Sequence, residues 1–269
     1  MSINIQKILI PVDSSSCSVT ALNAAKSLNS FYKASLFVHH VEESGVSSAD
    51  LKNKVSEILG SSAYTFSESS GNVTKEIVDK AEQLSANLII MGTHGANGFQ
   101  EFWMGSNAYK VVSSVKCPVL TVRDGVTNFA FKKIVMPMDT SFETRQKIPM
   151  ATDVAKNVGA SIHLIGVSTG KDKEAEHHVN SYMNQACDSI TDKGITCTVE
   201  NRLGGNITDT AIAYAKEINA DLIIIMSEQE PQIGSFFLGK FARQMVNHSP
   251  VPVITIPTRD DLLITDARL

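Results

Sequence analysis

Two short glycine-containing segments carry the residue types in this chain that could bind an anion. Gly92–Gly95 follows the apolar segment Leu88–Ile90, and Gly105 and Ser106 come after nine further residues. Glycine leaves backbone N–H groups uncovered, so an anion can approach them closely. A helix that begins at Gly105 and Ser106 would add the positive end of its dipole. The spacing therefore predicts a phosphate-binding turn built from two pieces of chain.

An internal repeat predicts the frame that holds this turn. Lys7–Asp13 matches Lys133–Asp139, 126 positions later, and Gly71–Thr74 matches Gly205–Thr208, 134 positions later. The second shift then holds without a gap to the end of the repeat, so the second copy carries eight extra residues before Gly205–Thr208. Chance does not produce two long registers in the same order. The chain is therefore predicted to contain two tandem copies of one domain.

Each copy alternates apolar strands with amphipathic helices. In the first copy, strands are predicted at 5–12, 36–41, 64–67, 88–91 and 118–122, with Ser14–Ser16 and Asn72 placed to cap helices. Continuous apolar strands separated by helices are typical of a parallel sheet covered on both faces. We therefore expect an α/β fold, made of two tandem copies of a five-stranded, doubly wound, Rossmann-like domain.

The length of the chain agrees with this organisation. Its 269 residues, of which 43% are hydrophobic, suit two domains of ordinary size. We predict a first domain at 1–124, a linker containing Gly125 at 125–130, a second domain at 131–258 and a mostly polar tail at 259–269.

Three features of the first copy fall where predicted strands end. Asp13 ends the first strand, Val41 ends the second, and Gly92 follows the fourth. In doubly wound sheets, ligands bind at the carboxyl ends of the strands, where the strand order reverses. Asp13 could accept hydrogen bonds from ribose hydroxyls, and the backbone at Val41 could meet an adenine edge. Asp13 could equally cap the helix that follows it.

These residues resemble the motifs of the universal stress protein family in its tandem two-domain form. The resemblance rests on the strand Pro11-Val12-Asp13, the strand ending in Val41, and the long-spaced glycine motif, and it covers nearly the whole chain. It implies a five-stranded parallel α/β fold that binds ATP, ADP or AMP, with or without magnesium. By this resemblance Asp13 and Val41 serve the adenosine, Gly92, Gly95, Gly105, Ser106 and Asn107 serve the phosphates, and Pro11, Val12, Met91 and His94 line the site.

The second copy departs from the motif at the positions that matter. Met226 stands opposite Gly92, Gln229 opposite Gly95 and Lys240 opposite Ser106, while Gly239 is kept. Side chains at these positions fill the space that a phosphate needs. We therefore expect no nucleotide in this pose in the second domain. Because the second copy keeps its strands without these glycines, their presence in the first copy is better explained by a ligand than by the fold.

Charge and composition argue against several classes of partner. The net charge of −4 gives no electrostatic footprint for nucleic acid, and no stretch approaches the roughly 20 apolar residues that span a membrane. The N-terminus lacks the pattern of a signal peptide. The four cysteines show no CxxC spacing, so neither a disulfide framework nor a metal site is expected. The chain is predicted to be cytoplasmic, with neither nucleic acid nor membrane as a partner.

Catalysis has little support in the sequence. No Walker lysine, nucleophile elbow or HExxH pair is present, so no catalytic residue is assigned and any ATP hydrolysis is expected to be slow. The leading hypothesis is a nucleotide-binding regulatory protein of the stress response. The alternatives are a weak ATPase, or an interaction protein without nucleotide that acts through its surfaces. The fifth strands, Val119–Val122 and Val253–Ile256, are expected edges that could pair within one chain as a pseudo-dimer, and a homodimer is also possible.

Overall fold

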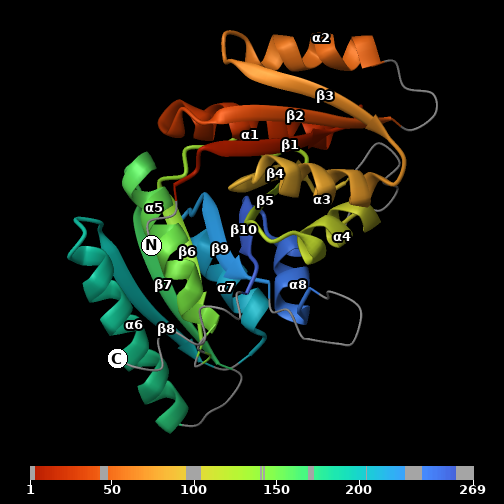
Figure 1. Cartoon of the computed structure of the whole chain (residues 1–269). Coiled ribbons are helices and arrows are strands. Elements are labelled where there is room, and N and C mark those ends of the chain that lie inside the picture. The colour runs from red at the N-terminus through yellow and green to blue at the C-terminus, as the bar shows by residue number, and fades with distance from the viewer. Residues whose placement is uncertain are drawn as a thin grey trace.

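The computed structural model describes residues 4–42, 48–94, 104–139, 141, 143–168, 173–203, 205–227 and 238–258. Strands and helices alternate in two halves (Figure 1). The first half contains β1 (Lys7–Val12), α1 (Ser16–Tyr32), β2 (Ser35–Glu42), α2 (Ser48–Leu59), β3 (Tyr64–Ser70), α3 (Val73–Leu84), β4 (Leu88–Gly92), α4 (Ser106–Ser114) and β5 (Val119–Val122). The second half contains β6 (Lys133–Met138), the 3-10 helix η1 (Glu143–Lys147), α5 (Ile148–Val158), β7 (Ser161–Ser168), α6 (Lys173–Thr191), β8 (Cys197–Leu203), α7 (Ile207–Glu217), β9 (Leu222–Met226), α8 (Lys240–His248) and β10 (Val253–Ile256).

All ten of these strands form one sheet, in the order β3-β2-β1-β4-β5-β10-β9-β6-β7-β8. Neighbouring strands within each half are parallel, which confirms the predicted five-stranded doubly wound domain in two copies. The two halves join where β5 pairs with β10 in the antiparallel direction. In each half the strand order reverses beside the first strand, so β1 and β6 mark the two switch points.

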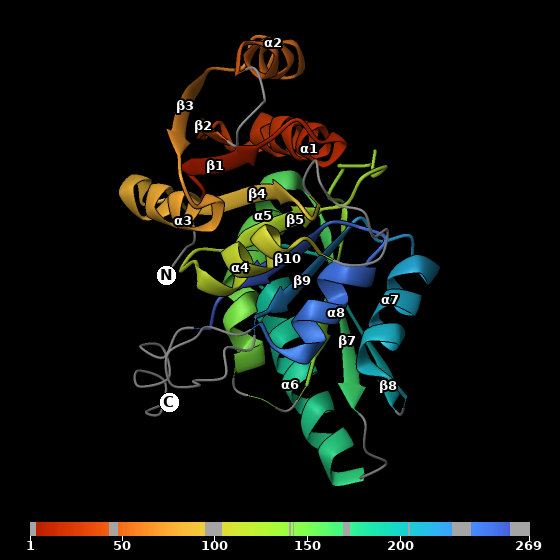
Figure 2. The same cartoon turned by 90° about the vertical axis from the view of Figure 1, so that its right-hand side faces the viewer.

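Helices cover both faces of the sheet because successive strand residues point to opposite sides. Ile8 and Ile10 of β1 pack in one apolar cluster with α1 and α2, and Leu9 packs in a second cluster with α3 and α4. Figure 2 shows these two pairs of helices on opposite sides of the first half of the sheet. No helix among the described residues is long and apolar enough to cross a membrane.

Local capping rules explain where several helices begin. The Asn72 side chain accepts a hydrogen bond from the Lys75 N–H at 3.0 Å, and the Asn206 side chain accepts one from the Thr208 N–H at 2.9 Å. Both asparagines are N-caps, which satisfy a backbone donor that the first helical turn leaves without a partner. Ser15 is the residue of Ser14–Ser16 that caps α1.

The junction between the halves runs from the end of β5 to the start of β6. The segment from 123 to 132 is described throughout and contains neither helix nor strand, and the predicted linker at 125–130 lies within it. Gly125 adopts a φ of +78°, a conformation that favours glycine. The predicted tail at 259–269 lies outside the described residues.

Candidate functional site

The carboxyl ends of β1, β2 and β4 bring several of the predicted site residues to one edge of the sheet. Val12 is the register partner of His40, so Asp13 and Val41 follow side by side. The Ser15 hydroxyl contacts the His94 carbonyl at 3.5 Å and donates to the Asp13 carboxylate, which links β1 to the turn after β4. These contacts place the aspartate and the glycine motif next to each other, as a ligand spanning both would require.

Asp13 anchors the first turn of α1. Its Oδ1 accepts hydrogen bonds from the Ser15 N–H at 3.0 Å and from the Ser18 hydroxyl at 2.7 Å. In the second half, Asp139 accepts the matching bond from the Ser141 N–H at 2.9 Å. Ser15 is the N-cap of α1, so Asp13 holds the cap residue in place and does not itself cap the helix. Part of the same arrangement stands at Asp139, in a domain without the glycine motif. The role of Asp13 toward ribose stays a prediction.

Gly92 lies where β4 meets the first turn of α1. A Cβ atom at this position would stand 2.5 Å from the Cys17 Cβ and 3.0 Å from the Cys17 carbonyl carbon. Real Cβ atoms do not approach that closely, so α1 can begin here only because Gly92 has no side chain. This finding corrects, for Gly92, the expectation that the fold does not require the motif glycines. Burial raises the pKa of the Cys17 thiol, which disfavours the thiolate.

In the second half, the strand end that corresponds to Gly92 carries a side chain, and the helix start beside it differs. Met226 stands in place of Gly92 and is 5% exposed, and the chain opposite it forms η1 rather than the start of a regular α-helix. Lys147, at the end of η1, is buried, and its ammonium donates hydrogen bonds to the Pro137 carbonyl and, at 2.8 Å, to the Thr144 hydroxyl. A side chain at the strand end has thus been accommodated by rebuilding the helix start.

The N-terminus of α4 presents backbone donors to this edge. Gly105 is the N-cap, and no side chain at the cap accepts from the helix. The first bond within the helix runs from the Tyr109 N–H to the Gly105 carbonyl at 3.0 Å, so the N–H groups of Ser106 and Asn107 have no acceptor within α4. Both residues are exposed. This end of the helix therefore carries the donors and the partial positive charge that suit an anion.

A backbone hydrogen bond joins the two pieces of the glycine motif. The Gly105 N–H donates to the Thr93 carbonyl at 2.7 Å, and the Gly239 N–H donates to the Ser227 carbonyl at 3.0 Å in the second half. Gly105 has a φ of −56° and Gly239 a φ of −55°, values open to any residue. The hydrogen bond that joins the strand end to the helix start is thus the same in both domains.

The remaining predicted residues divide between the edge and the core. Val41 and Met91 are buried in the same apolar cluster as Ala108 of α4, so they form a wall beneath the helix start. Val12 packs in the cluster on the opposite face, and Pro11 is buried within β1, so these two residues support the strand.

His94 carries a polar atom with no partner among the described residues. Its Nδ1 lies 2.9 Å from the Thr93 hydroxyl, while its buried Nε2 makes no hydrogen bond there. A buried polar atom without a partner costs free energy, so a ligand atom that bonds Nε2 would be favoured. Gly95 lies outside the described residues, as does Gln229 in the second half, and their predicted roles stay predictions.

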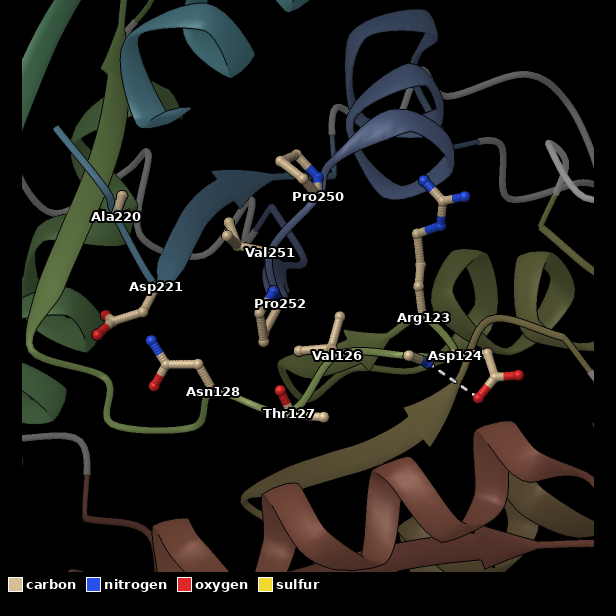
Figure 3. Close-up of a pocket in the computed structure, with 11 residues that line it drawn as sticks. Arg123, Asp124, Val126, Thr127, Asn128, Ala220, Asp221, Pro250, Val251 and Pro252 are labelled. Atoms are coloured by element: carbon tan, nitrogen blue, oxygen red, sulfur yellow. Dashed lines mark hydrogen bonds between the residues drawn. The ribbon is translucent and has the colours of Figure 1, made fainter. Parts of the chain in front are cut away.

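A pocket of about 400 Å³ lies beside this edge, between the segment after β5 and the start of β10 (Figure 3). Eleven residues line it: Arg123, Asp124, Gly125, Val126, Thr127, Asn128, Ala220, Asp221, Pro250, Val251 and Pro252. Asp124 turns its carboxylate toward the Gly125 N–H, at 2.9 Å, and accepts from the Ser16 hydroxyl at 2.7 Å. The pocket's lining contains none of the predicted site residues, so it neighbours the candidate site without forming it.

Sequence reasoning missed the parts of the site that hold others in place. Ser18 and Cys17 were not singled out from the sequence. For Ser18, the internal repeat contains a signal that could have identified it. The spacing of Asp13, Ser15 and Ser18 recurs as Asp139, Ser141 and Thr144. Among the described residues, no group of three or more His, Cys, Asp or Glu side chains is placed to hold a metal ion.

The ten-stranded sheet and the strand-end motif together define a tandem doubly wound α/β protein. The model of the universal stress protein family matches residues 42–123 and 130–257. The chain belongs to the universal stress protein family, present here as two domains in one chain.

Individual relatives agree with this assignment. A universal stress protein of Methanocaldococcus jannaschii is 29% identical over 140 residues, covering 44% of this chain and 82% of its own length. One from Bacillus subtilis is 28% identical over 145 residues, covering 44% of this chain and 98% of its own. The crystal structure of a universal stress protein from Archaeoglobus fulgidus is 23% identical with a TM-score of 0.76, covering 93% of this chain and 98% of that one, which shows a shared fold.

Proposed function

We propose that the first domain binds an adenine nucleotide, with ATP as the expected ligand, and that the protein acts as a cytoplasmic regulator of the stress response. One observation carries this proposal. The N-terminus of α4, whose cap residue Gly105 has no side chain, is hydrogen-bonded to the turn at Gly92–His94, at the strand edge where Asp13 also lies. In this proposal, the backbone donors bind the phosphates and the Asp13 carboxylate binds the ribose of one nucleotide.

Each residue has a defined role in this proposal. The N–H groups at the start of α4, beginning with Ser106 and Asn107, bind the phosphates, with or without magnesium. His94 Nε2 gains a partner when the nucleotide is bound, and Asp13 serves the ribose with the carboxylate that also binds the cap residue Ser15. The backbone at Val41 meets the adenine. Gly95 is expected to add backbone donors to the phosphates.

The second domain is proposed to bind no nucleotide in this pose. Met226 brings a side chain to the strand end, and Lys240 replaces the first residue of the phosphate-binding helix. We propose that this domain instead completes a pseudo-twofold pair with the first. The antiparallel pairing of β5 with β10 supports this arrangement. It also covers the strand edges through which a protein acting only by its surfaces would bind partners.

A charge placed at the helix start tests the proposal. Ser106→Asp puts a carboxylate where the phosphates would lie, and it should weaken ATP binding by at least about tenfold through repulsion. An acidic residue in the first turn stabilises a helix by about 0.3–1 kcal/mol, so the fold should survive. Binding is measured by isothermal titration calorimetry and by the ATP-induced rise in melting temperature.

The repeat supplies a matched control for this experiment. Lys240→Asp makes a corresponding change at the start of α8 in the second domain, and it should leave ATP affinity unchanged. Equal losses in both variants would contradict the assignment of the site to the first domain. Failure of the wild-type protein to bind ATP, ADP or AMP would overturn the proposed function as a whole.

A further inference from the structure

A residue of the second domain reaches the start of the proposed phosphate-binding helix in the first. The Met104 N–H donates a hydrogen bond of 2.6 Å to Asn247 Oδ1, across 143 positions of sequence. Met104 directly precedes Gly105, the N-cap of α4. Asn247 lies near the end of α8 and is 4% exposed, so water does not compete effectively for this bond.

Two successive backbone donors at this end of α4 are therefore held by acceptors from the two different domains. The Gly105 N–H is bound by the Thr93 carbonyl of the first domain, and the Met104 N–H is bound by Asn247 of the second. Together these bonds fix the direction in which the following N–H groups of Ser106 and Asn107 point. Donors that serve an anion must be held close to their working positions, because a small displacement loses much of the interaction.

The repeat shows that this support is not reciprocal. Asn247 corresponds to Ser113 of α4 at the 134-residue shift. Ser113 donates its hydroxyl proton to the Tyr109 carbonyl of its own helix, at 2.8 Å. Arg243 and Tyr109 are also equivalent positions, and they stack on each other with 5.6 Å between the guanidinium carbon and the ring centre. The two helices thus contact each other through equivalent positions, while the equivalent side chains at 113 and 247 make different bonds.

We propose that Asn247 is a positioning residue for nucleotide binding by the first domain, which rests on the function proposed above. Its side chain fixes the N-terminus of α4 through the Met104 N–H. The second domain, whose own motif has been replaced, thereby completes the phosphate site of its neighbour.

The test compares ATP with adenosine, measured by isothermal titration calorimetry on the full chain. Asn247→Leu keeps the approximate volume and removes the acceptor, so ATP should bind about three- to tenfold more weakly, the loss expected for one hydrogen bond. Adenosine affinity should stay unchanged, because adenosine has no phosphates to meet α4. Asn247→Ser, whose hydroxyl is too short to reach Met104, should give the same selective loss if the leucine variant fails to fold.

The matched control is Ser113→Ala, which removes a buried hydrogen bond at the equivalent position and should leave both affinities unchanged. If the wild-type protein binds ATP and the Asn247 variants bind it equally well, Asn247 has no positioning role. Equal losses for ATP and adenosine would show general damage to the domain and would also overturn the inference. If the wild-type protein binds no adenine nucleotide, the proposed function itself fails.

Discussion

Gly92 shows how one position can satisfy both packing and binding. The first turn of α1 approaches β4 so closely that Cys17 occupies the space of a Cβ atom. The same contact brings Ser15 and Asp13 to the turn that follows β4. The absence of a side chain at Gly92 therefore allows these residues to come together at the edge of the sheet. This packing role holds whether or not an anion also binds the Gly92 N–H. In the second domain, Met226 and η1 show the alternative.

A methyl group at this position should destabilise the first domain. We expect Gly92→Ala to lower the free energy of unfolding by about 1–3 kcal/mol, the usual cost of overpacking. Urea denaturation monitored by circular dichroism measures it. Gly105→Ser is the control, because Gly105 has an ordinary φ of −56° and serine is a good N-cap. The free energy of unfolding of this variant should not fall. An unchanged midpoint for Gly92→Ala would show that α1 can move away at little cost.

At the scale of helices and strands, the sequence was a good guide wherever the determining contacts are local. Asn72 and Asn206 cap the helices they precede, and the segments predicted as strands in the first half become β1 to β5, because both depend on residues a few positions apart. The bond between Met104 and Asn247 has no such local signal, since it joins residues 143 positions apart. The approach of Gly92 to Cys17 likewise depends on how a helix packs on a strand.

A buried histidine of β2, His39, should make the free energy of unfolding depend on pH. His39 belongs to β2, and its ring contacts two serines of β3. Its Nδ1 lies 2.9 Å from the Ser67 hydroxyl, and its Nε2 lies 3.1 Å from the Ser69 hydroxyl. Burial, aided by the charge of Lys80, lowers its pKa below the ordinary 6.5. As the pH falls through 6.5, the unfolded chain takes up a proton that the folded chain resists, so the free energy of unfolding should fall.

A variant that lacks His39 isolates this effect. His39→Gln should show a smaller loss of stability between pH 7.5 and pH 5.5 than the wild-type protein does, as measured by urea midpoints at each pH. His163 also has a lowered pKa, caused by burial and the charge of Lys133, so some dependence should remain. An identical pH profile in the variant would show that His39 is protonated as easily in the folded state as in the unfolded one.

At the scale of the whole molecule, three contacts hold the two halves together. The strands β5 and β10 pair in the sheet, α4 and α8 meet on one face, and on the other face the Tyr32 hydroxyl of α1 donates to the Asp153 carboxylate of α5 at 2.8 Å. Burial raises the pKa of Asp153 and that of Tyr32, so this contact is partly withdrawn from water. The contacts between the two halves thus lie in the sheet and on both of its faces.

The register of the central strands makes a prediction about the first domain alone. Thr121 faces Val253, Leu120 faces Ile254 and Val119 faces Thr255. At the 134-residue shift, Leu120 therefore faces its own equivalent, and the pairs on either side of it are exchanged copies of each other. Such a register is self-complementary. A fragment of residues 1–124 exposes β5 as an edge, and we expect it to form a symmetric homodimer in which Leu120 faces its own copy. Light scattering coupled to size-exclusion chromatography gives its mass, with the full chain as the size reference. A fragment that keeps its circular dichroism and stays monomeric at every concentration would show that β10 contributes something that a second β5 cannot supply.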